Sequence, residues 1–250
     1  IDLGFFSIKR TLAGFSGEIE LTAASASLAA RVTVAGFSVS GSYSWSWGAP
    51  PIITHQIDDV LYLNAGDTVD RYGDSDGELY GDVIHETYRI EAKLDKEGDP
   101  IPGVVVINAL GESKKHEGVS KVVFNGGRGN DTVMVYPGVD VLLEINGGPG
   151  VDTLMILGGG PGSVVRGGPG NDRILGGLVP GVKVFGDEGN DIFSGGEAGA
   201  IIDLGPGRNV IQAGTGDDEI TIRGSELTTL SDAGGNNRIR IENTPEARLT

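Results

Sequence analysis

The chain contains no cysteine, and its 250 residues include no apolar run of about 18 residues. Disulfide bonds are therefore excluded, and no transmembrane helix is expected. Basic residues are also scarce: 19 lysines and arginines stand against 35 aspartates and glutamates, which gives a net charge of −16. This balance argues against nucleic acids and anionic membranes as partners. A chain of this kind can still gain cross-links by binding metal ions.

Residue types that often act in catalysis are not clustered in this sequence. The three histidines, His55, His85 and His116, fall in separate segments, and no Gly-x-Ser-x-Gly elbow or Walker lysine loop is present. Zinc and nucleophile sites need groups that are closer or better matched. Carboxylates are too frequent in this chain for a pair of them to indicate glycosidase chemistry. We therefore expect no enzyme activity.

Glycine, by contrast, is abundant, with 43 residues. It is concentrated in a pattern that occurs four times, as Gly-Gly-Arg-Gly-Asn-Asp at 126–131, Gly-Gly-Pro-Gly-Val-Asp at 147–152, Gly-Gly-Pro-Gly-Asn-Asp at 167–172 and Gly-Asp-Glu-Gly-Asn-Asp at 186–191. The starts lie 21, 20 and 19 residues apart, and a short apolar run follows each copy. This pattern predicts an all-β fold, a parallel β-solenoid (β-roll or β-helix) of about 20 residues per rung.

The aspartate that closes each loop gives the repeat its chemistry. Glycines permit positive φ, so the chain can turn sharply with its carbonyl groups directed inward. Because rungs stack at about 4.8 Å, Asp131, Asp152, Asp172 and Asp191 would form a row of like charges. Such a row raises the pKa of each carboxyl or opens the edge unless a cation lies between them. Carboxylate and carbonyl oxygens are the ligands that calcium prefers, so we expect Ca²⁺ along this edge. The alternative is that these residues serve only turn geometry.

The pattern Gly-Gly-x-Gly-x-Asp-x-apolar-x resembles the RTX (repeats-in-toxin) calcium-binding nonapeptide of the parallel β-roll. Val133, Leu154, Ile174 and Phe193 fill the apolar place. The resemblance covers about half of the chain and implies that the aspartates of neighbouring loops share each ion, with loop carbonyls completing the shell. Carried over, the expected metal-site residues are Gly126, Arg128, Asp131, Gly147, Gly148, Pro149, Gly150, Asp152, Gly167, Gly168, Pro169, Gly170, Asp172, Asp187, Gly189 and Asp191.

The chain departs from the RTX pattern in its period. RTX rolls place a motif about every nine residues, whereas the full motif here occurs once per rung, so we expect one binding edge and one plain turn edge. Beyond Asp191 the ladder is expected to change edge. The loop that ends at Asn209 has lost its aspartate, and the next loop has gained Asp218. Asp218 with Asn237 is a second, weaker candidate site, and Asn130, Asn171 and Asn190 are expected to be turn residues.

Three regions are expected along the chain: a strand region at 1–50, a β-rich segment at 51–120 and the solenoid at 121–250. Residues 51–120 should lead into the solenoid and cap its first rung, since a bare rung exposes apolar surface and strand edges. The acidic stretch at 65–82 fits a solvated loop better than an irregular calcium site.

The first region has an aromatic face. Phe37, Val39, Tyr43, Trp45 and Trp47 alternate with small polar residues, so they share one side of a strand. A core face is the favoured interpretation, and a carbohydrate-binding platform is the alternative.

These features predict an extracellular, calcium-binding structural segment of a bacterial surface, fibre or adhesin protein. The chain begins with Ile1 and shows no signal peptide, so we expect a piece of a longer polypeptide. Open-ended solenoids can stack head to tail, and the expected partners are therefore calcium ions, further copies or neighbouring segments of the same long chain, and a glycan or cell-surface ligand. Two alternatives stay open: a secretion and folding module of a larger RTX enzyme, and a carbohydrate-binding module.

Overall fold

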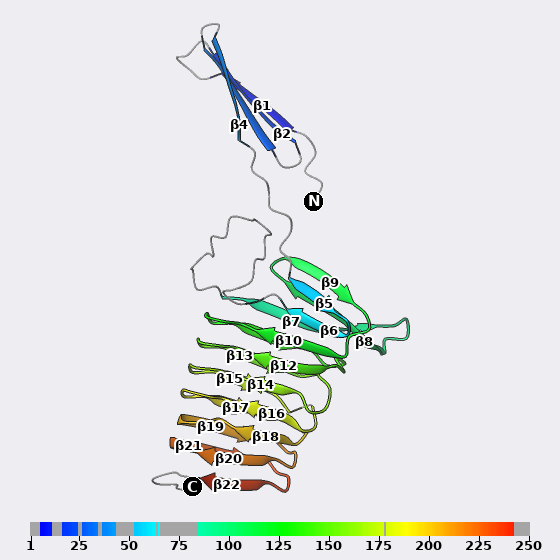
Figure 1. Ribbon diagram of the computed structural model, residues 1–250, viewed down its shortest axis with the longest axis vertical. Helices are drawn as coiled ribbons and strands as arrows, with labels where there is room; N and C mark the ends of the chain where they lie inside the picture. The colour runs from blue at the N-terminus through cyan, green and yellow to red at the C-terminus, as the bar shows by residue number, and fades with distance from the viewer. Residues whose placement is uncertain are drawn as a thin grey trace. The chain divides into compact units, whose positions relative to one another are not determined.

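The computed structural model describes residues 6–11, 17–24, 27–34, 37–43, 53–63, 65, 85–177 and 179–242. All elements in these residues are β-strands (Figure 1). None of the described residues belongs to a helix that could cross a membrane. Contacts divide the chain into two compact units, Ile1–Pro51 and Ile52–Thr250.

The first unit is a four-stranded antiparallel sheet in the order β1-β2-β3-β4. Each strand pairs with the next along the chain, and the strands span Phe6–Thr11, Gly17–Ala24, Ser27–Val34 and Phe37–Tyr43. Of the predicted aromatic face, Trp45 and Trp47 lie outside the described residues, as do the side chains of the remaining members.

The second unit is a parallel β-solenoid, which confirms the predicted fold class. Two sheets of nine strands each form its walls, and the chain alternates between them for about six turns (Figure 1). We call the sheet that contains β10 sheet 1 and the sheet that contains β11 sheet 2. The turns that lead from sheet 1 to sheet 2 form the first edge, and the returning turns form the second edge.

The strands of the repeat are short, and each pairs in parallel with the strand one turn later. In sheet 1 they are β10 (Lys121–Asn125), β12 (Leu142–Asn146), β14 (Val164–Arg166), β16 (Val182–Phe185), β18 (Ala200–Asp203), β20 (Glu219–Arg223) and β22 (Arg238–Glu242). In sheet 2 they are β11 (Thr132–Val135), β13 (Thr153–Ile156), β15 (Arg173–Leu175), β17 (Ile192–Ser194), β19 (Gly207–Ala213) and β21 (Ser225–Asp232).

The core is a set of in-register apolar ladders inside the solenoid. Val133 lies opposite Leu154, then Ile174, then Phe193 on successive rungs, and all four are buried. These are the residues that the repeat predicted at its apolar place. Because side chains along a strand point alternately to its two faces, the residues next to each buried one in the chain face outward. The burial of these apolar ladders fixes the stacking register.

Further strands extend both sheets beyond the first rung: the two that pair with this rung are parallel to it, and the outer ones pair in antiparallel fashion. β5 (Thr54–Ile57) and β6 (Val60–Leu63) form a hairpin whose second strand pairs with β10. β7 (Thr87–Leu94) pairs with β11, and β8 (Pro100–Ala109) and β9 (Glu112–His116) extend sheet 2 from it. The acidic stretch at 65–82, apart from residue 65, lies outside the described residues.

Candidate metal centre

The four repeat aspartates form one buried row along the first edge. Asp131, Asp152, Asp172 and Asp191 each precede a strand of sheet 2, and each is at most 1% exposed. Carboxylates are almost never fully buried unless they are paired or bind a metal. The contacts of each carboxylate oxygen therefore decide whether these buried groups can be charged.

One oxygen of each carboxylate joins successive rungs. The backbone N–H of Asp131 donates to Asp152 Oδ1 at 2.7 Å, that of Asp152 to Asp172 Oδ1 at 2.8 Å, and that of Asp172 to Asp191 Oδ1 at 2.9 Å. Each aspartate thus holds the loop of the rung before it. The row has the register that the repeat spacing predicted.

The second oxygen has no such partner. The Oδ2 atoms of Asp152, Asp172 and Asp191 are buried and accept no hydrogen bond. Asp152 Oδ2 lies against the α-carbon of Gly147, where the carbonyl oxygen of Gly167 also approaches. At Gly186, Asp191 Oδ2 approaches in the same way, together with the carbonyl oxygen of Leu204. Two electron-rich oxygens therefore face one small space, which is the arrangement that a cation satisfies.

Main-chain oxygens would have to supply much of any ligand shell. Within the residues that the structure describes, no group of three or more His, Cys, Asp or Glu side chains is placed to hold a metal ion. Loop carbonyls stacked beside one carboxylate per rung are consistent with calcium, which accepts backbone oxygens readily.

Burial shifts the titration of the row. It raises the pKa of Asp152 and Asp191 to about 6 and that of Asp172 to about 7. Neighbouring negative charges raise the pKa of Asp172 further, while the hydrogen bond that it accepts from the Asp152 N–H opposes the shift. Without a cation, the row therefore resists full ionisation at neutral pH.

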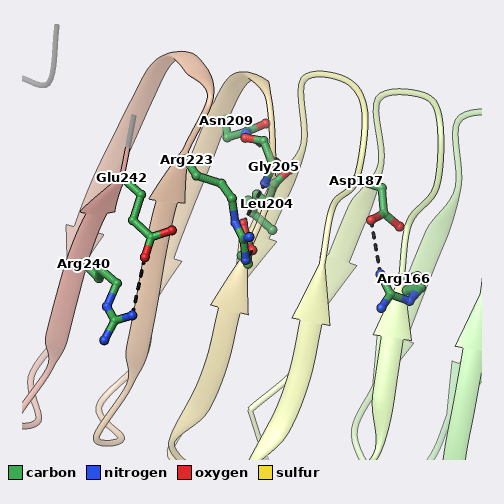
Figure 2. A network of polar contacts seen from close by, with 9 residues as sticks. Arg166, Asp187, Leu204, Gly205, Asn209, Arg223, Arg240 and Glu242 are labelled. Carbon is green, nitrogen blue, oxygen red and sulfur yellow. Dashed lines mark hydrogen bonds and ion pairs between the residues drawn. The ribbon is translucent and has the colours of Figure 1, made fainter. Parts of the chain in front are cut away.

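In the next rung, a neutral side chain occupies the position of the aspartates. Asn209 occupies the aspartate place and accepts the N–H of Asp191 at 2.8 Å. Its Nδ2 then donates to the carbonyl oxygens of Gly205 at 2.9 Å and Leu204 at 3.4 Å (Figure 2). An amide nitrogen stands where the aspartates have Oδ2, so the buried row ends in a neutral, hydrogen-bonded side chain.

A second, shorter row lies on the second edge. Asp218 precedes β20, accepts the N–H of Ala200 at 2.8 Å and donates its own N–H to Asn237 Oδ1 at 2.7 Å. Its Oδ2 is buried without a hydrogen bond, and burial raises the pKa of this carboxyl. Asn237 Nδ2 donates to the Gly234 carbonyl at 3.1 Å, much as Asn209 binds its own loop. The structure thus places the residues of the weaker candidate site on adjacent rungs.

Comparison with known proteins agrees with this geometry. Four segments, residues 123–142, 156–178, 183–198 and 201–221, match the RTX calcium-binding nonapeptide repeat. The chain carries RTX repeats. No curated protein and no solved structure matches it. RTX nonapeptide repeats bind Ca²⁺, so these turns form a calcium-binding β-roll module.

The RTX period emerges gradually along the solenoid. Successive rungs of the aspartate row are separated by 21, 20, 19 and finally 18 residues. From Gly186 onward the motif starts, at Gly186, Gly195, Leu204 and Ala213, lie nine residues apart. The predicted spacing of about 20 residues holds for the early turns. The later turns shorten to two nonapeptides, and there the second edge acquires its aspartate.

Close stacking explains why the RTX loops need glycine. Gly148 has φ of +97°, and a β-carbon on it would overlap the carbonyl oxygen of Gly127. A β-carbon on Gly150 would overlap the Gly129 carbonyl in the same way. Third-position carbonyls also bridge rungs, since those of Pro149 and Pro169 accept N–H groups from the loop before at 3.1 and 2.9 Å.

Two loop side chains, those of Asp187 and Arg128, are unsuited to bind a buried ion. Asp187 stands at a second position that is glycine in the other loops, with φ of +70°, and its carboxylate pairs with Arg166 at 3.2 Å (Figure 2). Only its main-chain carbonyl remains as a candidate ligand. The same holds for Arg128, whose side chain is cationic.

The fifth-position asparagines form their own ladder. Asn130, Asn171 and Asn190 each accept the N–H of the fifth residue in the following loop, at 2.9, 2.7 and 2.7 Å. They are turn residues, as expected, but their bonds run between rungs and in the direction opposite to the aspartate bonds.

Sequence reasoning missed the start of the aspartate row. His85 and Glu86 stand where the next rung has Asn130 and Asp131, since Thr87 aligns with Thr132. His85 Nδ1 accepts the Asn130 N–H at 2.7 Å, and the Glu86 N–H donates to Asp131 Oδ1 at 2.8 Å. Glu86 is buried at the aspartate place. The sequence His-Glu-Thr at 85–87 can be aligned with Asn-Asp-Thr at 130–132. This match is easily missed because no glycine loop of the repeat type precedes it.

Proposed function

We propose that this chain is a calcium-locked structural segment of an extracellular bacterial protein, of the surface, fibre or adhesin class. One observation carries the proposal: the buried Oδ2 atoms of Asp152 and Asp191 face loop carbonyls at the place where Asn209 presents an amide nitrogen. A bound cation at the aspartate rungs would supply the positive charge that the amide supplies at Asn209.

The residues that would hold calcium follow from this contrast. Asp131, Asp152, Asp172 and Asp191, with the carbonyls of their loops, would clasp up to three ions between successive rungs, and Asp218 with Asn237 would form a further, weaker site. Bound Ca²⁺ provides charge neutralisation and oxygen coordination. Because the row is preformed only in the folded solenoid, ion binding adds to the free energy of unfolding.

An extracellular location is supported by composition. The net charge of −16 and the absence of cysteine suit a medium rich in calcium, where ions replace disulfides as cross-links. Proteins with RTX repeats are typically secreted. A cytosol poor in calcium would leave the row unneutralised and the segment loosely folded during export.

The remaining parts would support this role. Residues 51–120 would lead into and cap the solenoid, since β6 and β7 pair with the first repeat strands, β10 and β11. The far end would contact another copy or a neighbouring segment of a longer chain. We propose no catalytic role. A folding module beside an RTX enzyme is the second candidate, and a catalytic sequence elsewhere in the parent chain would favour it.

A titration tests the calcium mechanism. The chain, freed of metal with a chelator, is titrated with CaCl₂ or MgCl₂ while far-UV circular dichroism and Tm are recorded. We expect β signal and Tm to rise with calcium only, and Asp152→Ala or Asp172→Ala to reduce the response. Glu197→Ala, which removes an exposed carboxylate on the second edge, is the control. Full folding without metal and no response to calcium would refute the mechanism.

A further inference from the structure

A groove of about 740 Å³ runs along the outer face of sheet 1, beside the first-edge loops. Its floor is one in-register ladder of outward side chains from consecutive rungs, Asn125, Asn146, Arg166, Phe185 and Asp203. The prolines at the third position of the loops form the opposite wall. The volume lies within the range of about 300–1,000 Å³ that is typical of ligand sites.

The two arginine side chains of the groove are held in place yet remain accessible. Arg166 Cζ lies 4.1 Å from the centre of the Phe185 ring, and its Nη1 is 3.2 Å from Asp187 Oδ1 (Figure 2). Arg223 pairs with Asp203. The two arginine side chains are still 44% and 55% exposed. Since a guanidinium carries five N–H donors, each arginine retains donors for a ligand while its position is fixed.

We infer that this groove binds a neutral, linear oligosaccharide. Amide, guanidinium and carboxylate groups placed one per rung can donate to and accept from adjacent hydroxyl groups. The Phe185 ring and the proline wall offer apolar surface to the C–H faces of sugar rings. The rung spacing of about 4.8 Å is close to the length of one hexose unit in an extended chain, so successive sugars meet successive rungs.

Charge and topology argue against other polymers. The two arginines of the groove are already paired, and Glu188 adds a further negative charge to the lining. An anionic polymer would therefore meet a net negative surface. A peptide that adds as a β-strand needs a free sheet edge, whereas β12, β14, β16 and β18 on the floor are paired on both sides. The inference goes beyond the structural role proposed above and uses none of the aromatic residues of the first unit.

The test uses the whole chain in saturating calcium. Isothermal titration calorimetry is run with neutral linear hexasaccharides of glucose, mannose, galactose or xylose, with a galacturonate hexamer, and with an Ala/Ser hexapeptide. We expect at least one neutral glycan to bind, with affinity rising from the disaccharide to about five units, the number of rungs on the floor. Preferential binding of the galacturonate or the peptide, or no neutral glycan bound at millimolar concentration, would overturn the inference.

Variants locate the site. Arg166→Ala and Phe185→Ser should each weaken glycan binding by about tenfold or more. Lys183→Ala is the matched control, because Lys183 lies on the same strand as Phe185 and faces outward on the neighbouring ladder, outside the groove lining. Circular dichroism in calcium verifies that each variant is folded. Equal binding by the Arg166 and Lys183 variants would place the ligand elsewhere and contradict the inference.

Discussion

At the scale of single residues, aspartate and asparagine have nearly the same shape in this row, but they bury different hydrogen-bonding groups. Asp172 and Asn209 both accept a backbone N–H through Oδ1. The remaining atom is a buried oxygen without a hydrogen bond in Asp172 and a donating nitrogen in Asn209. In the proposed mechanism, the side chain at this one place determines whether a rung needs a cation.

Asp172→Asn tests this directly. In chelator, we expect the variant to be more stable than the parent chain by about 1–3 kcal/mol, the cost of a buried group that lacks its partner. In calcium, it should be stabilised less than the parent, because one carboxylate of the row is gone. Urea unfolding with and without calcium measures both effects. Asp217→Asn is the control, since Asp217 is exposed and also accepts a backbone N–H, from Asn236. A metal-free variant that is less stable than the parent would contradict the account.

Val151 interrupts the asparagine ladder and offers a second residue-scale test. It is 52% exposed and stands where the other three copies of the motif have asparagine, so it cannot accept the N–H of Asn171. We expect Val151→Asn to raise the free energy of unfolding by about 0.5–1.5 kcal/mol, the net worth of one hydrogen bond. The gain should be equal in calcium and in chelator because the side chain lies outside the aspartate row. Val151→Ala, measured in the same urea series, should show no gain.

At the scale of elements, the repeat predicted its own loops, strands and register, but not the strands that lie outside it. Glycine and aspartate placed the loops, and the apolar place of the repeat located β11, β13, β15 and β17. β9 was missed because Glu-Ser-Lys-Lys-His has no apolar face; it is a charged edge strand of the kind that discourages further pairing. Glu86 lies 45 residues from its partner Asp131, outside the repeat spacing of 18–21 residues, so the repeat did not place it. The hydrogen bonds of the Asn209 side chain to its own loop were likewise not evident from the sequence.

The aspartate row as an element should make stability depend on pH, with a sign that calcium reverses. In the folded chain the pKa of Asp152 and Asp191 is about 6 and that of Asp172 about 7, against about 3.9 when unfolded. The folded state therefore binds more protons in this window, so without metal the contribution of these three carboxyls to the free energy of unfolding is greatest below pH about 4 and is lost as pH rises through 6–7.

Calcium binds the ionised carboxylates, and with saturating calcium the free energy of unfolding should instead rise over the same pH range. Urea unfolding at pH 5 and pH 8, in chelator and in calcium, gives the four values needed. The control is Asp172→Asn, whose dependence on pH should be weaker in both conditions. Stability that increases with pH in chelator would show that the row is ionised without a metal.

At the scale of the whole molecule, the chain contains two units that are stabilised in different ways. The first is an antiparallel sheet whose strands pair only with one another. The second is a stack in which each rung contacts its neighbours, so its stability is close to a sum of rung and interface terms. The sequence predicted a separate strand region at 1–50 but not whether it joins the solenoid, because alternating strands of either kind have the same period in the sequence.

Amide hydrogen exchange should distinguish the two units by their response to calcium. We expect added calcium to slow amide exchange most in β11 to β18, which flank the aspartate row, and to leave β1 to β4 unchanged, because no residue of the row lies in the first unit. The last rung should gain least, since Ile239 and Ile241 of β22 remain 42% and 40% exposed. Exchange followed by mass spectrometry over seconds to hours reports each segment. In Asp172→Ala, protection should fall around β13 to β17 alone; equal slowing of β1 to β4 would mean that calcium acts on the chain as a whole and that the row is not its site.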